Sequence, residues 1–391
     1  MPRSDRVVAL SLAIAAIAIY LACAIGHGTI YDYFARLAEA MLSGRWWLAE
    51  APDYLNELVP CGEGRLCVVY VPLPVLAVLP FLTVLEDGAA QTAASALCGG
   101  LAAAPAFLAL RRLVPRGVAI ATTVFAMWGT NLWFAAADGR AWYLAHSLAA
   151  LLASVALLAA LDGRPAWLVG ALVGATALAR PPVALAAFGL ALLVARRRGA
   201  PLPRVALSGA LGLAPFAVAL AVYDQLRFGS PFETGYAALA AGDPFYPDGL
   251  FSLSYVPRHF YAMVMQAPEF VAGSFPLFAL PSWIGVSLLL TSPAFLYAFA
   301  ARRRAEILPL ALAALLPLLV NVTHGTIGFA QFGYRFSLDS QPFLLPLVAM
   351  GACLRDGVWV APRWTYLATI AWCVLANLYG VVAIIFFGFV T

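Results

Sequence analysis

A single aspartate follows the first apolar stretch of the chain, in the run Tyr31-Asp32-Tyr33. After it, apolar residues recur at helical spacing as far as Gly44, which predicts a short amphipathic helix lying in a membrane interface. A carboxylate at the start of such a helix could act as a general base on a substrate hydroxyl. It could also cap the helix by accepting hydrogen bonds from free amides. The residues around Asp32 leave both roles open.

Two cysteines in the same loop are the next residues that could do chemistry together. Cys61 and Cys67 are separated by the short run Gly-Glu-Gly-Arg-Leu. On an oxidising side of a membrane this spacing suits a small disulfide hairpin. The alternative is a metal site, but no histidine lies between the cysteines and no zinc-like spacing is present. We therefore expect a disulfide and no metal here.

The amino-acid composition indicates which class of protein contains these residues. The chain has 391 residues, of which 63% are hydrophobic and only 11% charged, with a mean hydropathy of +0.89. Ordinary soluble domains carry about 25% charged residues, so a water-soluble fold is excluded. The net charge of +4 comes from dispersed arginines, with no lysine, which excludes nucleic acid as a partner. The lack of lysine is typical of a GC-rich bacterial genome.

Uncharged apolar segments of bilayer length recur along the chain. One of them, Val68–Leu85, contains three prolines, so we expect a re-entrant or surface-lying piece. If it does not cross, 15 of the 23 arginines fall on one side, which the positive-inside rule assigns to the cytoplasm. The eleven predicted spans are Val7–Ile25, Ala89–Leu110, Gly117–Ala136, Trp142–Leu161, Ala166–Ala179, Val183–Ala195, Val205–Tyr223, Trp283–Ala301, Ile307–Val322, Phe343–Leu354 and Trp364–Val390.

The sequence thus predicts an all-α, polytopic helical bundle in a bacterial cytoplasmic (inner) membrane, with the N-terminus inside and the C-terminus outside. Residues 1–223 would form the core with an outer loop at 26–88, residues 224–282 a long outer loop, and residues 283–391 a C-terminal membrane region. No predicted full span contains Asp, Glu or Arg in its interior, although such residues mark ion pathways in transporters. Chemistry is therefore expected at the outer boundary of the membrane.

Four short motifs resemble those of one enzyme superfamily. They are Tyr31-Asp32-Tyr33, the element from Tyr70 to Pro74, the turn from Ala179 to Pro182, and the run from Gly333 to Phe336. On these motifs the chain resembles the GT-C membrane glycosyltransferases, in particular the bacterial mannosyltransferase-like and aminoarabinose-transferase-like branch, over most of its length. The superfamily also has a long outer loop after its seventh span.

The resemblance implies a membrane glycosyltransferase with a GT-C-like fold. Such an enzyme takes a hexose or pentose from a polyprenyl phosphate or diphosphate at the outer face. It transfers the sugar with inversion to a hydroxyl of a glycan, a lipid or a protein. No cofactor is certain, and a divalent cation is possible in this superfamily.

The resemblance also suggests roles for particular residues. Asp32 would be the general base, although many relatives have two adjacent acids there. Arg335 is the first candidate for the donor phosphate, because guanidinium groups bind phosphate oxygens in a planar, bidentate way. The substrate-binding candidates are Glu57, Tyr70, Asp138, Arg140, His146, Arg180, Arg258, Tyr334 and Arg335.

Each of these roles has a simpler alternative. Asp138 could be a solvated turn residue, and Arg335 could form an ion pair with Asp339 across one helical turn. The other arginines could be interfacial anchors, which is the interpretation we favour for Arg227. The main alternative function is a flippase or transporter of lipid-linked sugars, which would place polar or charged groups along the interior of the bundle. A noncatalytic scaffold is the third possibility.

Overall fold

The computed structural model describes residues 2–271, 277–302, 304–355, 358–359 and 362–389. The predicted last span runs to Val390, which lies outside these residues. The α-helices are α1 (Arg3–Ala24), α2 (Tyr33–Leu42), α3 (Leu73–Val78), α4 (Asp87–Leu101), α5 (Ala103–Leu110), α6 (Arg116–Trp128), α7 (Leu132–Asp138), α8 (Ala141–Leu161), α9 (Ala166–Ala177), α10 (Ala186–Arg198), α11 (Leu202–Phe228), α12 (Tyr236–Ala240), α13 (Val256–Phe260), α14 (Leu288–Thr291), α15 (Ile307–Asn321), α16 (Gln341–Cys353) and α17 (Trp364–Val381).

Shorter elements complete the described chain. Short 3-10 segments are η1 (Pro181–Leu185), η2 (Leu253–Tyr255), η4 (Pro293–Ala300) and η5 (Arg335–Asp339), and π segments are η3 (Tyr261–Met265) and η6 (Val382–Phe386). Strands form antiparallel pairs: β1 (Leu58–Pro60) with β2 (Leu66–Val68), β3 (Glu269–Phe270) with β4 (Ala279–Leu280), and β5 (Leu354–Arg355) with β6 (Val358–Trp359).

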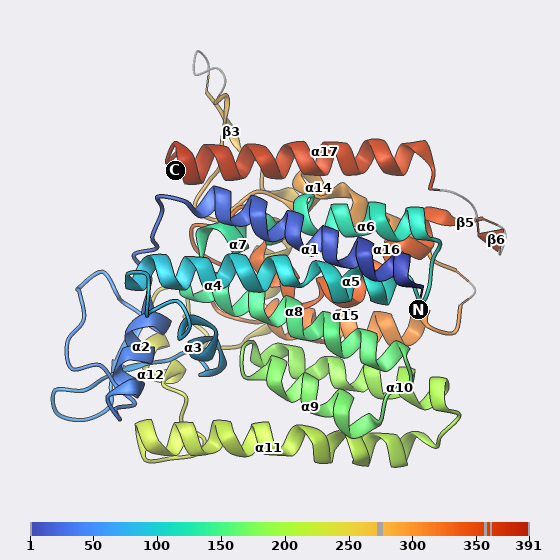
Figure 1. Cartoon of the computed structure of the whole chain (residues 1–391). Coiled ribbons are helices and arrows are strands. Elements are labelled where there is room, and N and C mark those ends of the chain that lie inside the picture. The colour runs from blue at the N-terminus through green and yellow to red at the C-terminus, as the bar shows by residue number, and fades with distance from the viewer. Residues whose placement is uncertain (1, 272–276, 303, 356–357, 360–361, 390–391) are drawn as a thin grey trace.

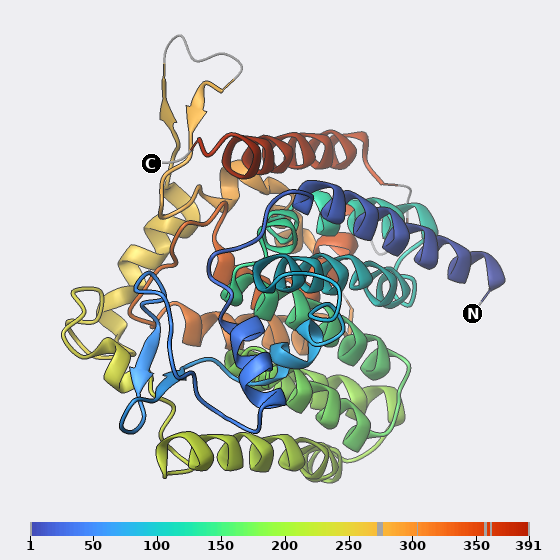
Figure 2. The same ribbon diagram turned by 60° about the vertical axis from the view of Figure 1, so that its left-hand side comes forward.

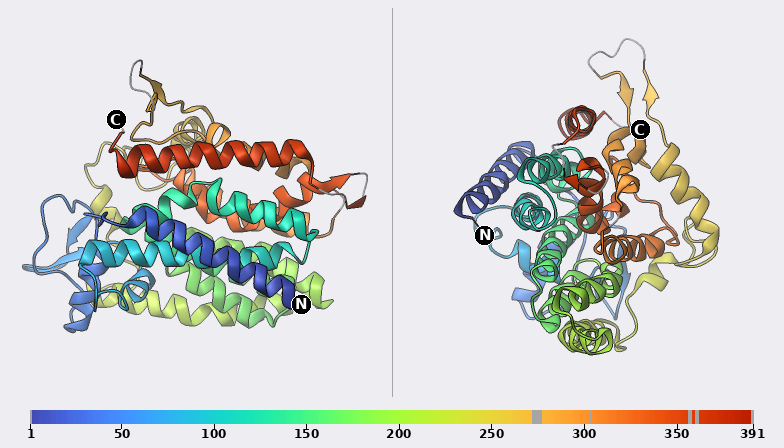
Figure 3. Two further views of the ribbon diagram at one scale, coloured as in Figure 1. Left: turned by 45° about the horizontal axis from the view of Figure 1, so that its top comes forward. Right: turned by 90° about the vertical axis from the view of Figure 1, so that its right-hand side faces the viewer.

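The long helices lie roughly side by side in one bundle, with α4 and α8 inside and α1, α11 and α17 at its periphery (Figures 1 and 3). The loop elements α2, α3 and α12 gather at one end of the bundle, and the start of α1 lies at the other end (Figure 1). The β3–β4 hairpin projects beyond the helices (Figure 2). Both long loops of the sequence therefore meet at the same end.

The prediction of a helical protein with several apolar spans is confirmed, but the number eleven is not. Within the described residues, five helical segments are long and apolar enough to cross a membrane, one of them formed by α4 and α5 together. The bent pair α6 and α7, which turns by 46°, would make a sixth. Three more predicted spans form apolar helices of only 10–17 residues, namely α9, α15 and α16. The predicted span Trp283–Ala301 forms the four-residue α14 and the 3-10 segment η4. In Trp283–Ala301, the buried Ser287 and Ser292 and the following Pro293 lie at the ends of these short elements, a feature that average hydropathy does not register.

Arginines form ion pairs at the end of the bundle where α1 begins. Asp5 is buried and pairs with Arg111 at 3.2 Å and with Arg116 at 3.8 Å. Arg112 pairs with Asp162 at the same end. The topology predicted from arginine counting places these arginines together, and the contacts agree with that grouping.

The first loop packs against the bundle more closely than expected. Helix α2 begins and ends where the sequence predicts, but Phe34, Leu37 and Ala38 of its apolar face are buried in protein rather than facing lipid. The segment Val68–Leu85 forms only the short α3, which lies against α2 and α4. The interfacial helix is thus part of the core of this end, because α3 and α4 cover the face predicted to meet lipid.

A disulfide between Cys61 and Cys67 joins strands β1 and β2, with an S–S distance of 2.04 Å. Arg227, at the end of α11, donates a hydrogen bond to the carbonyl oxygen of Val68 and pairs with Asp224. Only 4% of Arg227 is exposed, so the interpretation of this residue as an interfacial anchor is wrong. Its Nη1 and Nη2 atoms make these contacts and hold α11 against the hairpin.

Candidate functional site

Asp32 precedes the first residue of α2 but does not cap the helix with its side chain. Its Oδ1 accepts a hydrogen bond from Nε of Arg36 at 2.7 Å. Only 5% of the residue is exposed, and in the described part of the chain no donor reaches Oδ2. The capping role is therefore absent, and one carboxylate oxygen remains available.

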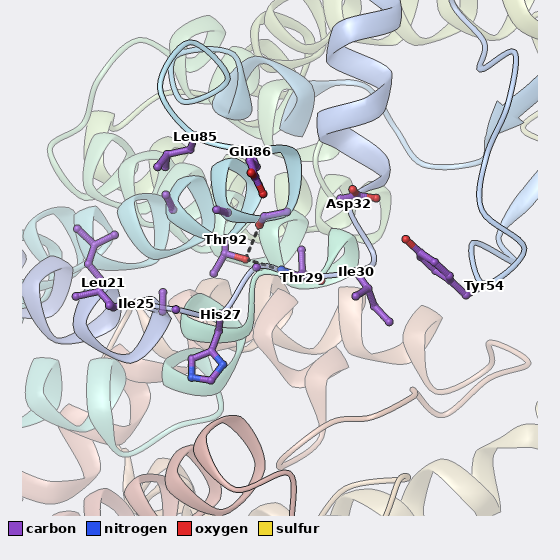
Figure 4. A pocket seen from close by; sticks show the side chains of 16 residues that line it. Leu21, Ile25, His27, Thr29, Ile30, Asp32, Tyr54, Leu85, Glu86 and Thr92 are labelled. Atoms are coloured by element: carbon purple, nitrogen blue, oxygen red, sulfur yellow. Dashed lines mark hydrogen bonds between the residues drawn. The ribbon is translucent and has the colours of Figure 1, made fainter.

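The Asp32 carboxylate lines a cavity of about 810 Å³ (Figure 4). Tyr54 and Glu86 also line the cavity, and the end of α1 contributes apolar residues. The lining residues are Leu21, Ala24, Ile25, Gly26, His27, Gly28, Thr29, Ile30, Asp32, Tyr54, Leu85, Glu86, Gly88, Ala89, Thr92 and Ala93. The site is thus an amphipathic space with a carboxylate in its wall.

Gln91 of α4 holds the backbone on both sides of Asp32. Its Oε1 accepts a hydrogen bond from the amide of Phe34, and its Nε2 donates to the carbonyl oxygens of Tyr31 and Gly139, both at 2.9 Å. Gln91 is completely buried. Sequence analysis did not single it out, although a glutamine inside an apolar segment was the available signal.

The turn after α7 brings Asp138 and Arg140 beside the Asp32 segment. Nε of Arg140 lies 3.2 Å from Oδ1 of Asp138, and the guanidinium lies over the ring of Tyr31. Nη1 of Arg140 and the hydroxyl of Tyr143 both donate to the carbonyl oxygen of Ala330. Ala330 has a φ of 45°, a left-handed conformation that costs an alanine energy. Asp138 thus pairs within the protein and is not a solvated turn residue.

Arg335 is the least satisfied charged side chain of this region. It is 8% exposed, and its Nε and Nη1 have no hydrogen-bond partner in the described part of the chain. Its guanidinium carbon lies 5.1 Å from the ring centres of Trp142 and of Phe336. Burial lowers its pKa from the usual value. The predicted alternative, an ion pair with Asp339, is not formed.

Glu57 is the carboxylate that opposes Arg335. The hydroxyl of Tyr70 donates a hydrogen bond to Oε2 of Glu57, and the amide of Glu57 donates to the hydroxyl of Tyr33. Burial among these groups raises the pKa of Glu57 to about 7, against the opposite effect of Arg335. Burial raises the pKa of the Tyr236 and Tyr246 hydroxyls, and the nearby charge of Glu57 raises it further. Glu57, Tyr70 and Arg335 therefore share one polar region.

The raised pKa of Glu57 predicts a pH dependence of stability. Because the folded protein holds this proton more tightly than the unfolded chain, stability should fall as the pH rises from about 4.3 to about 7 and then level off. The Glu57→Gln variant should lack this part of the slope. Its thermal midpoint relative to wild type should therefore increase between about pH 5 and about pH 8. The exposed Glu63→Gln variant is the matched control, and equal slopes in Glu57→Gln and wild type would contradict the assignment.

Arg180 and His146 meet in a separate, buried network around Asp339. Arg180 donates two hydrogen bonds to the carboxylate of Asp339, at 3.0 and 2.8 Å. Nδ1 of His146 lies 3.0 Å from Oδ1, and Asn321 donates to Oδ2 at 2.8 Å. Burial alone would raise the pKa of Asp339, but Arg180 and His146 hold it well below the usual range. These contacts give both predicted residues a role inside the protein, and Asp339 was not predicted as their partner.

Arg258 and Tyr334 fasten the long loop to the segment after α15. Arg258 lies 4.0 Å over the ring of Tyr255 and donates to the carbonyl oxygen of Gly325. The hydroxyl of Tyr334 lies 2.7 Å from Nδ1 of His259. Burial lowers the pKa of His259 to about 4, so this contact is made by a neutral histidine at neutral pH. Both predicted residues have partners within the chain.

Within the described residues, no group of three or more His, Cys, Asp or Glu side chains is placed to hold a metal ion. The predicted site residues thus divide into three neighbouring sets: the cavity with Asp32, the region of Glu57, Tyr70 and Arg335, and the Asp339 network. Tyr31 links the first two, because its ring lies 5.2 Å from that of Trp142, which lies under Arg335. Comparison of the chain with family models, curated proteins and solved structures finds no match.

Proposed function

We propose that the protein is a membrane glycosyltransferase that moves a sugar from a polyprenyl phosphate to an acceptor hydroxyl. The observation that carries this proposal is Arg335, a buried guanidinium with two nitrogens that have no hydrogen-bond partner among the described residues. A buried charge of this kind is costly unless a ligand completes it. Planar, bidentate binding of phosphate oxygens is the interaction that guanidinium groups make best.

The reaction divides between the two linked regions. Asp32 accepts the proton of the acceptor hydroxyl, whose oxygen forms a bond to the anomeric carbon of the donor. The bond from that carbon to the phosphate oxygen breaks, and the electron pair leaves with the phosphate. Arg335 stabilises the charge that develops on this leaving group. Attack from the side opposite the phosphate inverts the configuration, and the GT-C resemblance supports the same course.

The proposed membrane placement follows from charge. The arginine-rich end of the bundle faces the cytoplasm of a bacterial inner membrane by the positive-inside rule. The end with α2, α12 and the cavity then faces outward, where a disulfide is stable. The GT-C-like topology of eleven crossings is part of this proposal. It needs the shorter helices α9, α10, α15 and α16, and the segment formed by α14 and η4, to cross as well.

Turnover of a panel of polyprenyl-phosphate sugars tests the proposal. The Asp32→Asn variant keeps the shape of the side chain and removes its basicity, so kcat should fall by about 10²–10⁴-fold. Asp53→Asn, in an exposed part of the same loop, is the matched control and should keep wild-type activity. Full activity of Asp32→Asn would eliminate Asp32 as the base, and movement of the lipid across the membrane without transfer would support a flippase.

A further inference from the structure

The cavity in Figure 4 is acidic, which tells against a phosphate inside it. Asp32 and Glu86 both line it. Asp87 and Glu39 lie close by. Burial raises the pKa of Glu39, and the negative charge of Asp87 raises it further. In the described chain the only guanidinium paired with these acids is that of Arg36, on Asp32. Negative charge in the cavity repels a phosphate and attracts a cation.

A second feature is the free oxygen of the Asp32 carboxylate. Arg36 binds Oδ1, whereas no donor in the described chain reaches Oδ2. Since Asp32 lines the cavity, Oδ2 is open to it and can accept a hydrogen bond. The hydroxyl of Tyr54 extends toward the same part of the wall (Figure 4). The cavity therefore offers an acceptor for the hydrogen-bond donor of a ligand.

The remaining wall and the rim of the cavity are apolar. Leu21 and Ala24, near the end of α1, and Ala93 of α4 line its inside. On the rim, Ile25 is 75% exposed and Leu85 is 41% exposed. Both α1 and α4 are candidate spans, so in the proposed membrane placement this rim lies where helix ends meet the bilayer. An amphiphile could enter the cavity from the membrane with its head toward Asp32 and Glu86.

We propose that this cavity binds the head group of a membrane lipid that carries a hydroxyl beside a protonated amine, and that this lipid is the acceptor. The amine is held by the carboxylates, and the hydroxyl donates its hydrogen bond to Oδ2 of Asp32. The role as acceptor rests on the proposed function, whereas the binding of the lipid does not. The acid-lined cavity thus takes the acceptor, and the donor phosphate is left to Arg335.

Protection of an introduced thiol tests the binding. The Ile30→Cys variant places a thiol on the cavity wall, with Cys23, Cys98, Cys353 and Cys373 replaced by alanine. In phosphatidylcholine nanodiscs, the rate of modification by neutral methyl methanethiosulfonate is measured with hexadecylamine, hexadecanol or hexadecanoic acid at equal mole fraction. Hexadecylamine should slow the reaction by about tenfold, and the other two should have little effect. Adding Glu86→Gln should reduce that protection by about threefold.

A second reporter controls for effects on the reagent. The Phe232→Cys variant carries its thiol at a position that is 92% exposed, and its rate should not change with any additive. Equal protection of the Ile30→Cys thiol by all three lipids would overturn the preference for an amine. Equal protection by ethanolamine in the buffer, or by a tripeptide of lysine, would overturn the assignment of a membrane lipid as the ligand. None of these readings needs turnover, so failure here is separate from failure of the Asp32→Asn test.

Discussion

Replacing Arg335 with glutamine should lower sugar transfer by about a thousandfold while leaving the folded protein at least as stable as the wild type. Two nitrogens of this buried side chain have no partner in the described chain, so the charge destabilises the protein without ligand. In the proposed reaction, the same charge stabilises the departing phosphate. Function and stability should therefore move in opposite directions at this position.

The measurement pairs steady-state turnover with a thermal unfolding midpoint in the same detergent. Arg112→Gln is the matched control, because Arg112 pairs with Asp162 at the opposite end of the bundle, and it should keep full activity. In wild type, added polyprenyl phosphate should raise the midpoint, and in Arg335→Gln it should not. A variant that loses activity and unfolds at a clearly lower temperature would show that Arg335 serves the fold instead.

The Asp339→Ala variant should be destabilised by about 3–5 kcal/mol, the cost of leaving a buried partner of an ion pair uncompensated. Asp339 is 1% exposed and accepts hydrogen bonds from Arg180 and Asn321. Its removal leaves the guanidinium of Arg180 in the protein without a counter-charge. The free energy of unfolding, measured with a denaturant titration in detergent, gives the size of the effect.

Two further variants identify the cause of that loss. Asp162→Ala removes an ion pair whose side chains are 31% and 22% exposed, and it should cost at most about 1 kcal/mol. Combining Asp339→Ala with Arg180→Met should restore part of the lost stability, because the unpaired charge is then gone. Strictly additive losses in the double variant would mean that the two residues act independently.

Long apolar runs made the helical class and several helices predictable from the sequence. The predicted span Val205–Tyr223 lies inside α11, and Trp142–Leu161 nearly coincides with α8. Both runs are continuous and free of charge along most of their length, so burial in lipid or protein favours the same helix. At these residues the local sequence pattern and the tertiary structure both favour an α-helix.

Other segments differ from prediction because their hydrogen bonds are formed far away in the chain. The hydroxyl of Ser292 donates to the carbonyl oxygen of Gly129, at the bend between α6 and α7. This contact satisfies the backbone carbonyl of Gly129, and hydropathy averages contain no information about it. The predicted spans Gly117–Ala136 and Trp283–Ala301 are both interrupted next to this contact.

The candidate site shows the same division. Asp32 stood out in the sequence because it follows a span directly, and it lines the cavity in the structure. The partnership of Arg180 with Asp339 joins residues 159 positions apart, and Gln91 bonds to Gly139 across 48 positions. No window of sequence contains such pairs. These pairs come together only because α4 and η5 both pack against α8.

Helix α11 is exposed along almost all of its apolar length, and a helix of this kind answers changes in bilayer thickness by tilting. Its final turn is not free, because Arg227 bonds to Val68 in the disulfide-closed hairpin. The hairpin begins at Leu58, directly after Glu57. In the proposed membrane placement, a tilt of α11 would therefore displace the carboxylate that opposes Arg335, which would couple the thickness of the surrounding lipid to the proposed transfer reaction.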